Sequence, residues 1–78
     1  MNAKPTRVTN EIRSLRFAHG EMTQAELAER IGVTRQTIIA IEQGRYSPSL
    51  EMAFRIARVF GVPLDDVFQY PDIEGEAS

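Results

Sequence analysis

Hydrophobic positions in the middle of the chain recur at the spacing of an α-helix. Leu27, Ala28 and Ile31 form one apolar stripe, and Ile38 and Ile41 form a second stripe a few residues later. Residues three and four apart lie on the same face of a helix, so each stripe predicts a short helix with one inward face. A glycine-containing turn separates the two predicted helices.

Polar residues and glycines that bound these stripes carry signals for helix ends. Thr23 can cap a helix start through its hydroxyl, and Glu26, three residues later, can close a capping box. Gly32 offers the left-handed backbone that ends a helix, and Thr34 can cap the next helix. Gly44 ends that second helix. Two short capped helices joined by a tight turn have the layout of a helix-turn-helix.

The second helix of this pair leaves a polar and small-apolar face outside the core. With Ile38 and Ile41 turned inward, the outward positions are Arg35, Gln36, Ile39, Ala40 and Gln43. Arginine and glutamine can form hydrogen bonds with base edges, and small apolar groups can contact a thymine methyl. An exposed Ile39 is not needed for folding, and exposing its apolar side chain to water is unfavourable. Among these positions it is therefore the most informative sign of a contact with another molecule.

The same patterns predict structure at both ends of the chain. A first helix is expected at about 10–19, with Ile12 and Leu15 facing inward and Gly20 after its end. Residues 7–9 can form a very short strand. Residues 68–70 alternate apolar and polar side chains, so we expect this segment to pair with the first strand and bring the two ends together.

Two more helices are expected after the helix pair. Ser49 caps a fourth helix that ends at Gly61. Its inward stripe is expected to contain Leu50, Ala53, Phe54, Ala57 and Phe60, widened by Ile56 and Val59. Pro63 suits the first turn of a fifth helix, and Asp65 and Asp66 suit its positive end. This last helix is too short to be stable alone.

Length and composition narrow the class of protein. The chain has 78 residues and no cysteine, so we expect one domain without disulfides or thiolate metal sites. No apolar run approaches the roughly 20 residues that cross a bilayer, and the start of the chain lacks the apolar region of a secretory signal. These features predict a cytoplasmic protein without a membrane role.

Net charge and charge distribution point in different directions. The formal net charge is -2, and phosphate neutralisation by Lys and Arg supplies most non-specific DNA affinity. However, residues 1–20 carry Lys4, Arg7, Arg13 and Arg16 against Glu11 alone, whereas five carboxylates lie in the last fourteen residues. Exposed charges more than about 10 Å apart are largely screened. A basic face is therefore compatible with an acidic total.

The chain closely resembles the Cro/repressor-type helix-turn-helix family, also called the xenobiotic-response-element family. The resemblance covers about 10–68 and rests on the pattern T-Q-x-x-L-A-x-x-x-G-V-T-x-x-T-I-x-x-I-E-x-G, followed by R-Y-S-P-S-L and G-V-P-L-D-D-V-F. It is strongest to small stand-alone members such as the cytolysin operon repressor. It implies an all-α, five-helix, lambda-repressor-like DNA-binding domain at 10–68, an arm at 1–9 with a possible short strand, and a possible short strand followed by an acidic tail at 69–78.

The resemblance also implies a role for individual residues. The segment 35–37 matches positions that enter the major groove, Gln24 matches a glutamine that bonds a phosphate and braces the recognition helix, and 45–47 matches a loop that meets phosphate and sugar. The full set of expected DNA-contacting residues is Gln24, Thr34, Arg35, Gln36, Thr37, Ile39, Ala40, Arg45, Tyr46 and Ser47.

Two structural features follow from the same resemblance. Arg16 and Glu42 match a semi-buried ion pair that ties the first helix to the end of the recognition helix, and the alternative is two solvated surface charges. A homodimer seam is expected around Pro48, Pro63, Leu64 and Val67, where apolar side chains remain after the core is filled.

The chain departs from the family pattern at three places. Phe17 stands where such proteins usually carry a polar residue, and Ala40 replaces a longer polar side chain. Residues 20–22 form a loop one residue longer than in close members.

Other chemistries find little support in the residues. No nucleophile is accompanied by a candidate base, and no cluster has metal-ligand spacing, so we expect neither catalysis, nor a metal, nor a cofactor. His19 is expected to interact with the negative end of a helix dipole or with solvent, and not to bind a ligand. The predicted function is a sequence-specific regulator, most simply a repressor, that binds double-stranded DNA as a homodimer without a small-molecule effector. The alternative is a protein-interaction module, such as an antitoxin or anti-activator.

Overall fold

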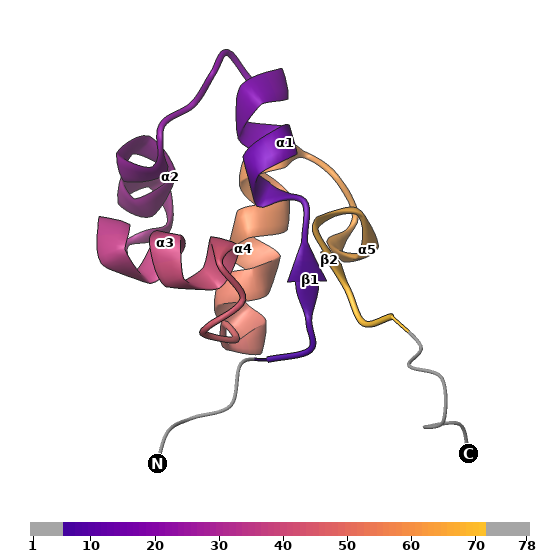
Figure 1. The fold of residues 1–78 in the computed structure, drawn as a ribbon. Coiled ribbons are helices and arrows are strands. Elements are labelled where there is room, and N and C mark those ends of the chain that lie inside the picture. The colour runs from indigo at the N-terminus through magenta and orange to yellow at the C-terminus, as the bar shows by residue number, and fades with distance from the viewer. Residues whose placement is uncertain (1–5, 72–78) are drawn as a thin grey trace, which may run out of the picture.

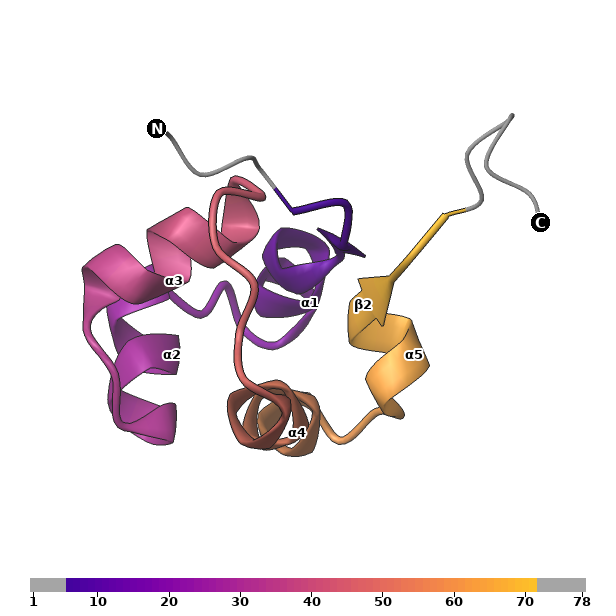
Figure 2. The same cartoon turned by 90° about the horizontal axis from the view of Figure 1, so that it is seen from below.

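Helices account for most of residues 6–71, the part of the chain that the computed structural model describes. In this part the elements are β1 (Thr9–Asn10), α1 (Ile12–Ala18), α2 (Gln24–Ile31), α3 (Arg35–Glu42), α4 (Leu50–Phe60), α5 (Leu64–Val67) and β2 (Phe68–Gln69). In Figure 1, α2 and α3 lie together at the left, α1 and α4 form the middle, and α5 and the strands lie at the right. Figure 2, seen from below, shows the same order of the helices. The predicted all-α class with five helices and a small sheet is confirmed.

The helix ends follow the capping signals of the sequence. The Thr23 hydroxyl accepts a hydrogen bond from the Glu26 N–H at 3.0 Å, and the Glu26 carboxylate accepts one from the Thr23 N–H at 2.8 Å. Thr34 caps α3 and Ser49 caps α4 in the same way. Gly32 has a φ of 78°, the left-handed conformation expected at the end of α2. These local predictions are confirmed because each depends on residues three or four apart.

The expected start of the first helix is two residues too early. Asn10 belongs to β1, and its side-chain oxygen accepts a hydrogen bond from the Ile12 N–H at 3.1 Å. The antiparallel strand pair itself is confirmed, with Thr9 opposite Gln69 and Asn10 opposite Phe68. The first strand therefore occupies 9–10 rather than 7–9.

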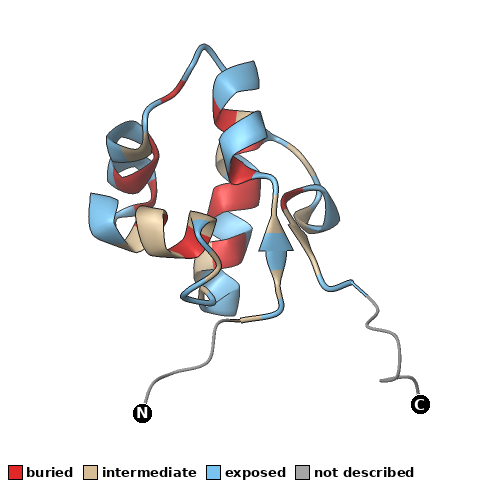
Figure 3. Ribbon diagram, viewed as in Figure 1, coloured by how far each residue is buried: buried red, intermediate tan, exposed pale blue. Residues whose placement is uncertain are grey.

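The core lies where α1, α2, α3, α4 and α5 meet, coloured red in Figure 3. Its largest fully buried side chains are Ile12, Leu27, Ile38, Ile41, Ile56 and Val67. Every helix contributes at least one of these residues. Burial of this common core stabilises helices that are too short to form on their own.

Two positions of α4 differ from the predicted inward stripe. Leu50 is 68% exposed and Phe54 is 50% exposed, whereas Ala53, Ile56 and Phe60 are buried. The period of 3.6 residues turns Phe54 by about 100° from Ala53 around the helix. Phe54 therefore falls outside the sector that the neighbouring helices cover, and the expectation that it faces inward was wrong.

Val67 also differs from its expected place. The sequence predicts this residue at a surface dimer seam, but its side chain is fully buried in the core. The single turn of α5 directs Val67 toward the other helices and leaves Asp65 and Asp66 exposed. Val67 therefore cannot line a surface seam in this structure.

Candidate nucleic-acid interface

The two faces of α3 have opposite environments. Ile38 and Ile41 are 0% and 2% exposed and anchor one face in the core. On the other face, Arg35 and Gln36 in the first turn are exposed. Ile39 is half-buried rather than fully exposed, as are Thr37 and Ala40. The buried isoleucines therefore hold α3 against the core, while its polar first turn faces solvent.

Two hydroxyls are linked at the start of α3. The Thr34 hydroxyl accepts a hydrogen bond from the Thr37 N–H at 3.2 Å, and the hydroxyl oxygens of Thr34 and Thr37 are 3.0 Å apart. A hydroxyl has one hydrogen to donate and two acceptor lone pairs, so one donor of the pair is still available to an external group. Thr34 therefore combines its capping role with a place beside Arg35 and Gln36.

A buried ionic cluster connects α1, α2 and α3. Arg16 donates two hydrogen bonds to the Glu42 carboxylate, from Nε at 2.7 Å and from Nη2 at 3.1 Å. The two side chains are only 8% and 10% exposed, so the expected Arg16–Glu42 pair is present and largely removed from water. Arg16 Nη1 also donates to the Met22 carbonyl oxygen at 2.9 Å. This two-point pairing fixes the last residue of α3 relative to α1.

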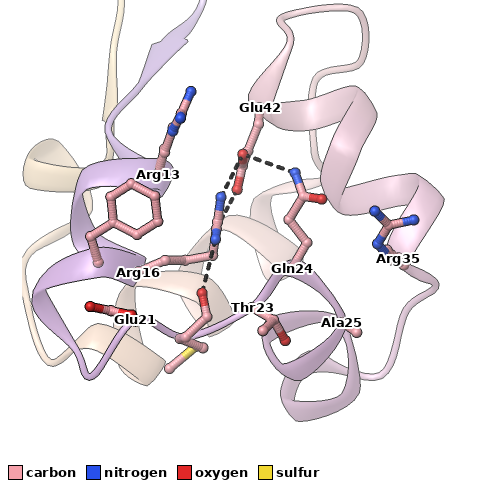
Figure 4. Close-up of a pocket in the computed structure, with 10 residues that line it drawn as sticks. Arg13, Arg16, Glu21, Thr23, Gln24, Ala25, Arg35 and Glu42 are labelled. Atoms are coloured by element: carbon pink, nitrogen blue, oxygen red, sulfur yellow. Dashed lines mark hydrogen bonds and ion pairs between the residues drawn. The ribbon is translucent and has the colours of Figure 1, made fainter.

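Gln24 joins this cluster from the first position of α2. Its Nε2 donates to Glu42 Oε1 at 3.2 Å, and Figure 4 shows the amide between Glu42 and Arg35. The expected bracing of the recognition helix by Gln24 is therefore visible as a direct side-chain contact. Its expected contact with a DNA phosphate stays a prediction.

A second connection to the end of α3 comes from Asn10, which the sequence analysis does not identify as a contact residue. Asn10 Nδ2 donates to the Ile41 carbonyl oxygen at 3.0 Å. Nearby, the Thr6 N–H donates to the Gly44 carbonyl oxygen at 3.1 Å. The Asn10 amide thus adds a side-chain bond to the Ile41 carbonyl oxygen, which also accepts the Gly44 N–H at 3.0 Å. No local pattern points to Asn10, because its partner is 31 residues away.

The loop after α3 continues the exposed face of that helix. Arg45, Tyr46 and Ser47 are all exposed, and the Arg45 N–H donates to the Ala40 carbonyl oxygen at 2.9 Å. Arg45 Nε donates to the Gln43 side chain at 2.8 Å, which leaves its terminal nitrogens for another acceptor. The expected phosphate-contacting loop is therefore accessible and tied to α3 by its backbone.

His19 occupies a helix end, as expected. It is the C-cap of α1, and its Nδ1 lies 2.9 Å from the Leu15 carbonyl oxygen. Its Nε2 lies 3.1 Å from the carbonyl oxygen of Phe60, the last residue of α4, and the two rings pack edge to face. His19 thus joins the ends of two helices.

An apolar groove lies apart from α3, between the loop before α4, α4, α5 and the strands. Its volume is about 320 Å³, and it is lined by Val8, Ser47, Pro48, Leu50, Ala53, Leu64 and Phe68. The groove brings together Pro48 and Leu64, two residues of the expected dimer seam. Pro63, a third seam residue, is exposed but does not line the groove.

The described residues contain neither a metal-binding cluster nor a membrane-spanning helix. Between residues 6 and 71, no three His, Cys, Asp or Glu side chains are grouped so that they could hold a metal ion. Within the same range, no helix combines the length and the apolar character needed to cross a bilayer.

The sequence of this chain is similar to those of proteins named as transcriptional regulators. Residues 12–67 match a family described as helix-turn-helix. An uncharacterized HTH-type transcriptional regulator of Methanocaldococcus jannaschii is 52% identical over 65 residues, which cover 83% of this chain and 97% of the relative. The transcriptional repressor RstR of the cryptic phage CTXphi in Vibrio cholerae is 37% identical over 59 residues, covering 76% of this chain and 52% of that protein.

Solved structures show the same fold. A hypothetical transcription factor from Neisseria superposes with a TM-score of 0.67 at 28% identity, covering 77% of this chain and 68% of that one. A candidate DNA-binding protein from Bacteroides fragilis superposes with a TM-score of 0.69 at 26% identity, covering 80% of this chain and 98% of that one. The arrangement of helices around α3 is therefore shared with these proteins.

Proposed function

Because the chain belongs to the XRE-type helix-turn-helix family of DNA-binding transcriptional regulators, we propose that it reads a specific sequence of double-stranded DNA. In this proposal α3 enters the major groove, and two copies bind an inverted repeat. The half-sites are then about 10 bp apart from centre to centre, one turn of the duplex. The named repressor among its relatives favours repression as the outcome.

The observation that carries the proposal is the exposed first turn of an anchored α3. Arg35 and Gln36 are both exposed, while Ile38 and Ile41 hold the opposite face in the core. Arginine can bond guanine O6 and N7 through two donors, and glutamine can bond adenine N6 and N7. Thr37 offers a hydroxyl, and Ile39 and Ala40 offer apolar contact to a thymine methyl. These residues are the proposed specificity determinants.

A second group of residues is proposed to position the protein on the duplex. Gln24, Arg45, Tyr46 and Ser47 present amide, guanidinium and hydroxyl groups beside α3, and each is at least partly exposed. Contacts to phosphate and sugar set register and orientation but carry no direct sequence information. In this proposal, residues of α3 contact the bases, and Gln24 and the loop at 45–47 contact the DNA backbone.

The apolar groove supports the homodimer part of the proposal. It holds Pro48 and Leu64 next to Leu50, whose side chain is 68% exposed. Covering this surface with the same surface of a second copy would remove apolar area from water. A two-fold dimer also matches the symmetry of an inverted repeat. Association would add stability to a domain of 78 residues, whose own core is small.

A selection of bound duplexes from a random pool tests the specificity directly. We expect an enriched inverted repeat. Arg35→Ala and Gln36→Ala should each cost about 1 to 3 kcal/mol at particular base pairs and relax the preference there. Arg45→Ala and Gln24→Ala should weaken binding to all sequences alike.

An absence of any enriched motif, even at low salt, would contradict the proposal. It would favour the alternative that the same helical surface holds a protein partner, as in an antitoxin or anti-activator. The apolar groove, which lies apart from α3, and the exposed Leu50 and Phe54 would add apolar area for such a partner.

A further inference from the structure

Phe17 is a large apolar side chain that α1 leaves outside the core. It is 53% exposed, whereas Ile12 of the same helix is fully buried. The guanidinium carbons of Arg13 and Arg16 each lie 5.5 Å from the centre of its ring. This distance is within the range at which a cation is attracted to the face of an aromatic ring. The surroundings of Phe17 are therefore two arginines rather than the core.

The two arginines differ in how their charges are used. Arg16 is paired with Glu42 and bonded to the Met22 carbonyl, so its charge is neutralised and its position is fixed. Arg13 contacts the ring of Phe17 and forms no hydrogen bond or ion pair with another group of residues 6–71. Stacking directs the Arg13 guanidinium while its five N–H donors remain available.

Arg13 lies at one side of a surface hollow that also contains part of the proposed DNA interface. The hollow has a volume of about 480 Å³ and is lined by residues of α1, α2 and α3. Figure 4 shows Arg13 on one side, Arg35 on the other and Gln24 between them. Apart from the neutral Arg16–Glu42 pair, the charged lining groups are these two arginines and Glu21. The hollow therefore has a local excess of positive charge.

We propose that Arg13 binds a DNA backbone phosphate in this hollow, with Phe17 as the residue that positions its guanidinium. The proposal rests on the function proposed above, because DNA read by Arg35 passes along the same hollow. Arg13 would thus extend the backbone contacts of Gln24 toward α1. It also gives a physical role to the aromatic residue at position 17.

Phosphate is the chemistry that fits the available groups. A guanidinium presents a planar fork of donors that matches two phosphate oxygens, and stacking on an aromatic ring leaves this fork free. The Glu21 carboxylate repels an anion at its edge of the hollow. A phosphate is therefore expected at the side lined by Arg13, Gln24 and Arg35. Inorganic phosphate offers the same oxygens, so the experiment includes it as a separate probe.

The test is the salt dependence of DNA binding by Arg13→Gln, measured by fluorescence anisotropy with a selected duplex and with its scrambled sequence. Losing one phosphate contact should reduce the slope of log K against log salt by about 0.9. The affinity ratio of wild type to variant should then fall about 3.5-fold between 50 and 200 mM salt, equally for both duplexes.

Arg30→Gln is the matched control for charge. Arg30 is exposed in the last turn of α2, at the opposite end of that helix from Gln24, and it does not line the hollow. This variant loses the same charge and should keep the wild-type slope. Equal slopes for Arg13→Gln and Arg30→Gln would overturn the inference, even where selection still returns a motif read by Arg35.

Phe17 variants separate positioning from packing. Phe17→Tyr keeps an aromatic face and should bind DNA with the wild-type slope and affinity. Phe17→Leu keeps apolar volume without the ring face, and it should weaken both duplexes about twofold to fivefold, less than the loss of the charge itself. Binding by Phe17→Leu equal to that of Phe17→Tyr would contradict the positioning role. Thermal melting of all variants checks that they remain folded.

Inorganic phosphate distinguishes a backbone contact from a free-anion site. At matched ionic strength, phosphate in place of chloride should shift the melting temperature of wild type and Arg13→Gln equally. A shift confined to wild type, together with DNA binding by Arg13→Gln that equals that of wild type, would instead assign the hollow to free phosphate and overturn the DNA contact.

Discussion

Glu42 shows how much one side chain at the end of α3 contributes to the fold. Its carboxylate accepts hydrogen bonds from Arg16 and Gln24, and the paired side chains are about one-tenth exposed or less. Removing one partner of a buried pair leaves the other charge without compensation. We expect Glu42→Ala to lower the free energy of unfolding by about 3 kcal/mol, measured by urea denaturation.

Glu51 provides the matched control for that measurement. It pairs with Arg55 at 3.0 Å on the surface of α4, where the two side chains are 77% and 55% exposed. Glu51→Ala should change the free energy of unfolding by less than about 1 kcal/mol, because water solvates both charges. Equal losses in Glu42→Ala and Glu51→Ala would contradict a special role for the buried pair.

A contact between two side chains can be predicted from the sequence only where a motif identifies both residues. The Arg16–Glu42 pair was expected because both residues match a family motif, and the structure contains it. Asn10 bonds the Ile41 carbonyl across 31 residues, and no motif announces that contact. Arg13 and Phe17 line the same hollow as Gln24 and Arg35 only because three helices converge there.

At the scale of elements, the turn between α2 and α3 sets the direction of α3. Gly32 has a φ of 78°, and a methyl group at this position would meet nothing closer than the Arg55 guanidinium at 3.9 Å. Space is therefore sufficient, and the cost of substitution is the backbone conformation. We expect Gly32→Ala to lower the free energy of unfolding by about 1 to 2 kcal/mol.

Asparagine tests whether the backbone is the cause. It tolerates the left-handed conformation better than alanine does, so Gly32→Asn should lose less stability than Gly32→Ala in the same denaturation experiment. The opposite order would indicate that contacts of the larger side chain, and not φ, decide the effect.

Helices and caps were more predictable than helix faces. Thr23, Thr34 and Ser49 form the capping bonds that their local sequence predicts. Phe54 shares a plausible apolar stripe with Ala53 but lies half-exposed. Several sectors of an apolar helix satisfy the same period, and the positions of neighbouring helices select which sector is covered.

At the scale of the whole molecule, we expect folding, self-association and DNA affinity to depend on one another. The apolar groove contains Leu50, which is 68% exposed at the first position of α4. A carboxylate there suits the helix start, so Leu50→Glu should stay folded while weakening dimerisation about tenfold or more. Sedimentation over a range of micromolar concentrations measures this change.

Arg30→Gln serves again as a folded surface variant in that experiment. It should associate like wild type because Arg30 does not line the groove. A wild-type protein that stays monomeric at micromolar concentration, both free and on DNA, would contradict the symmetric dimer. Binding of one copy per half-site without cooperativity would do the same.

Local patterns along the chain predict the helices, their caps and the helix-turn-helix family, because these patterns depend on residues a few positions apart. Packing decided the rest. It buried Val67, exposed Phe54 and joined Asn10 to the end of α3. Contacts between distant segments depend on the mutual placement of whole helices, and this placement is set by how all their apolar faces fill one core.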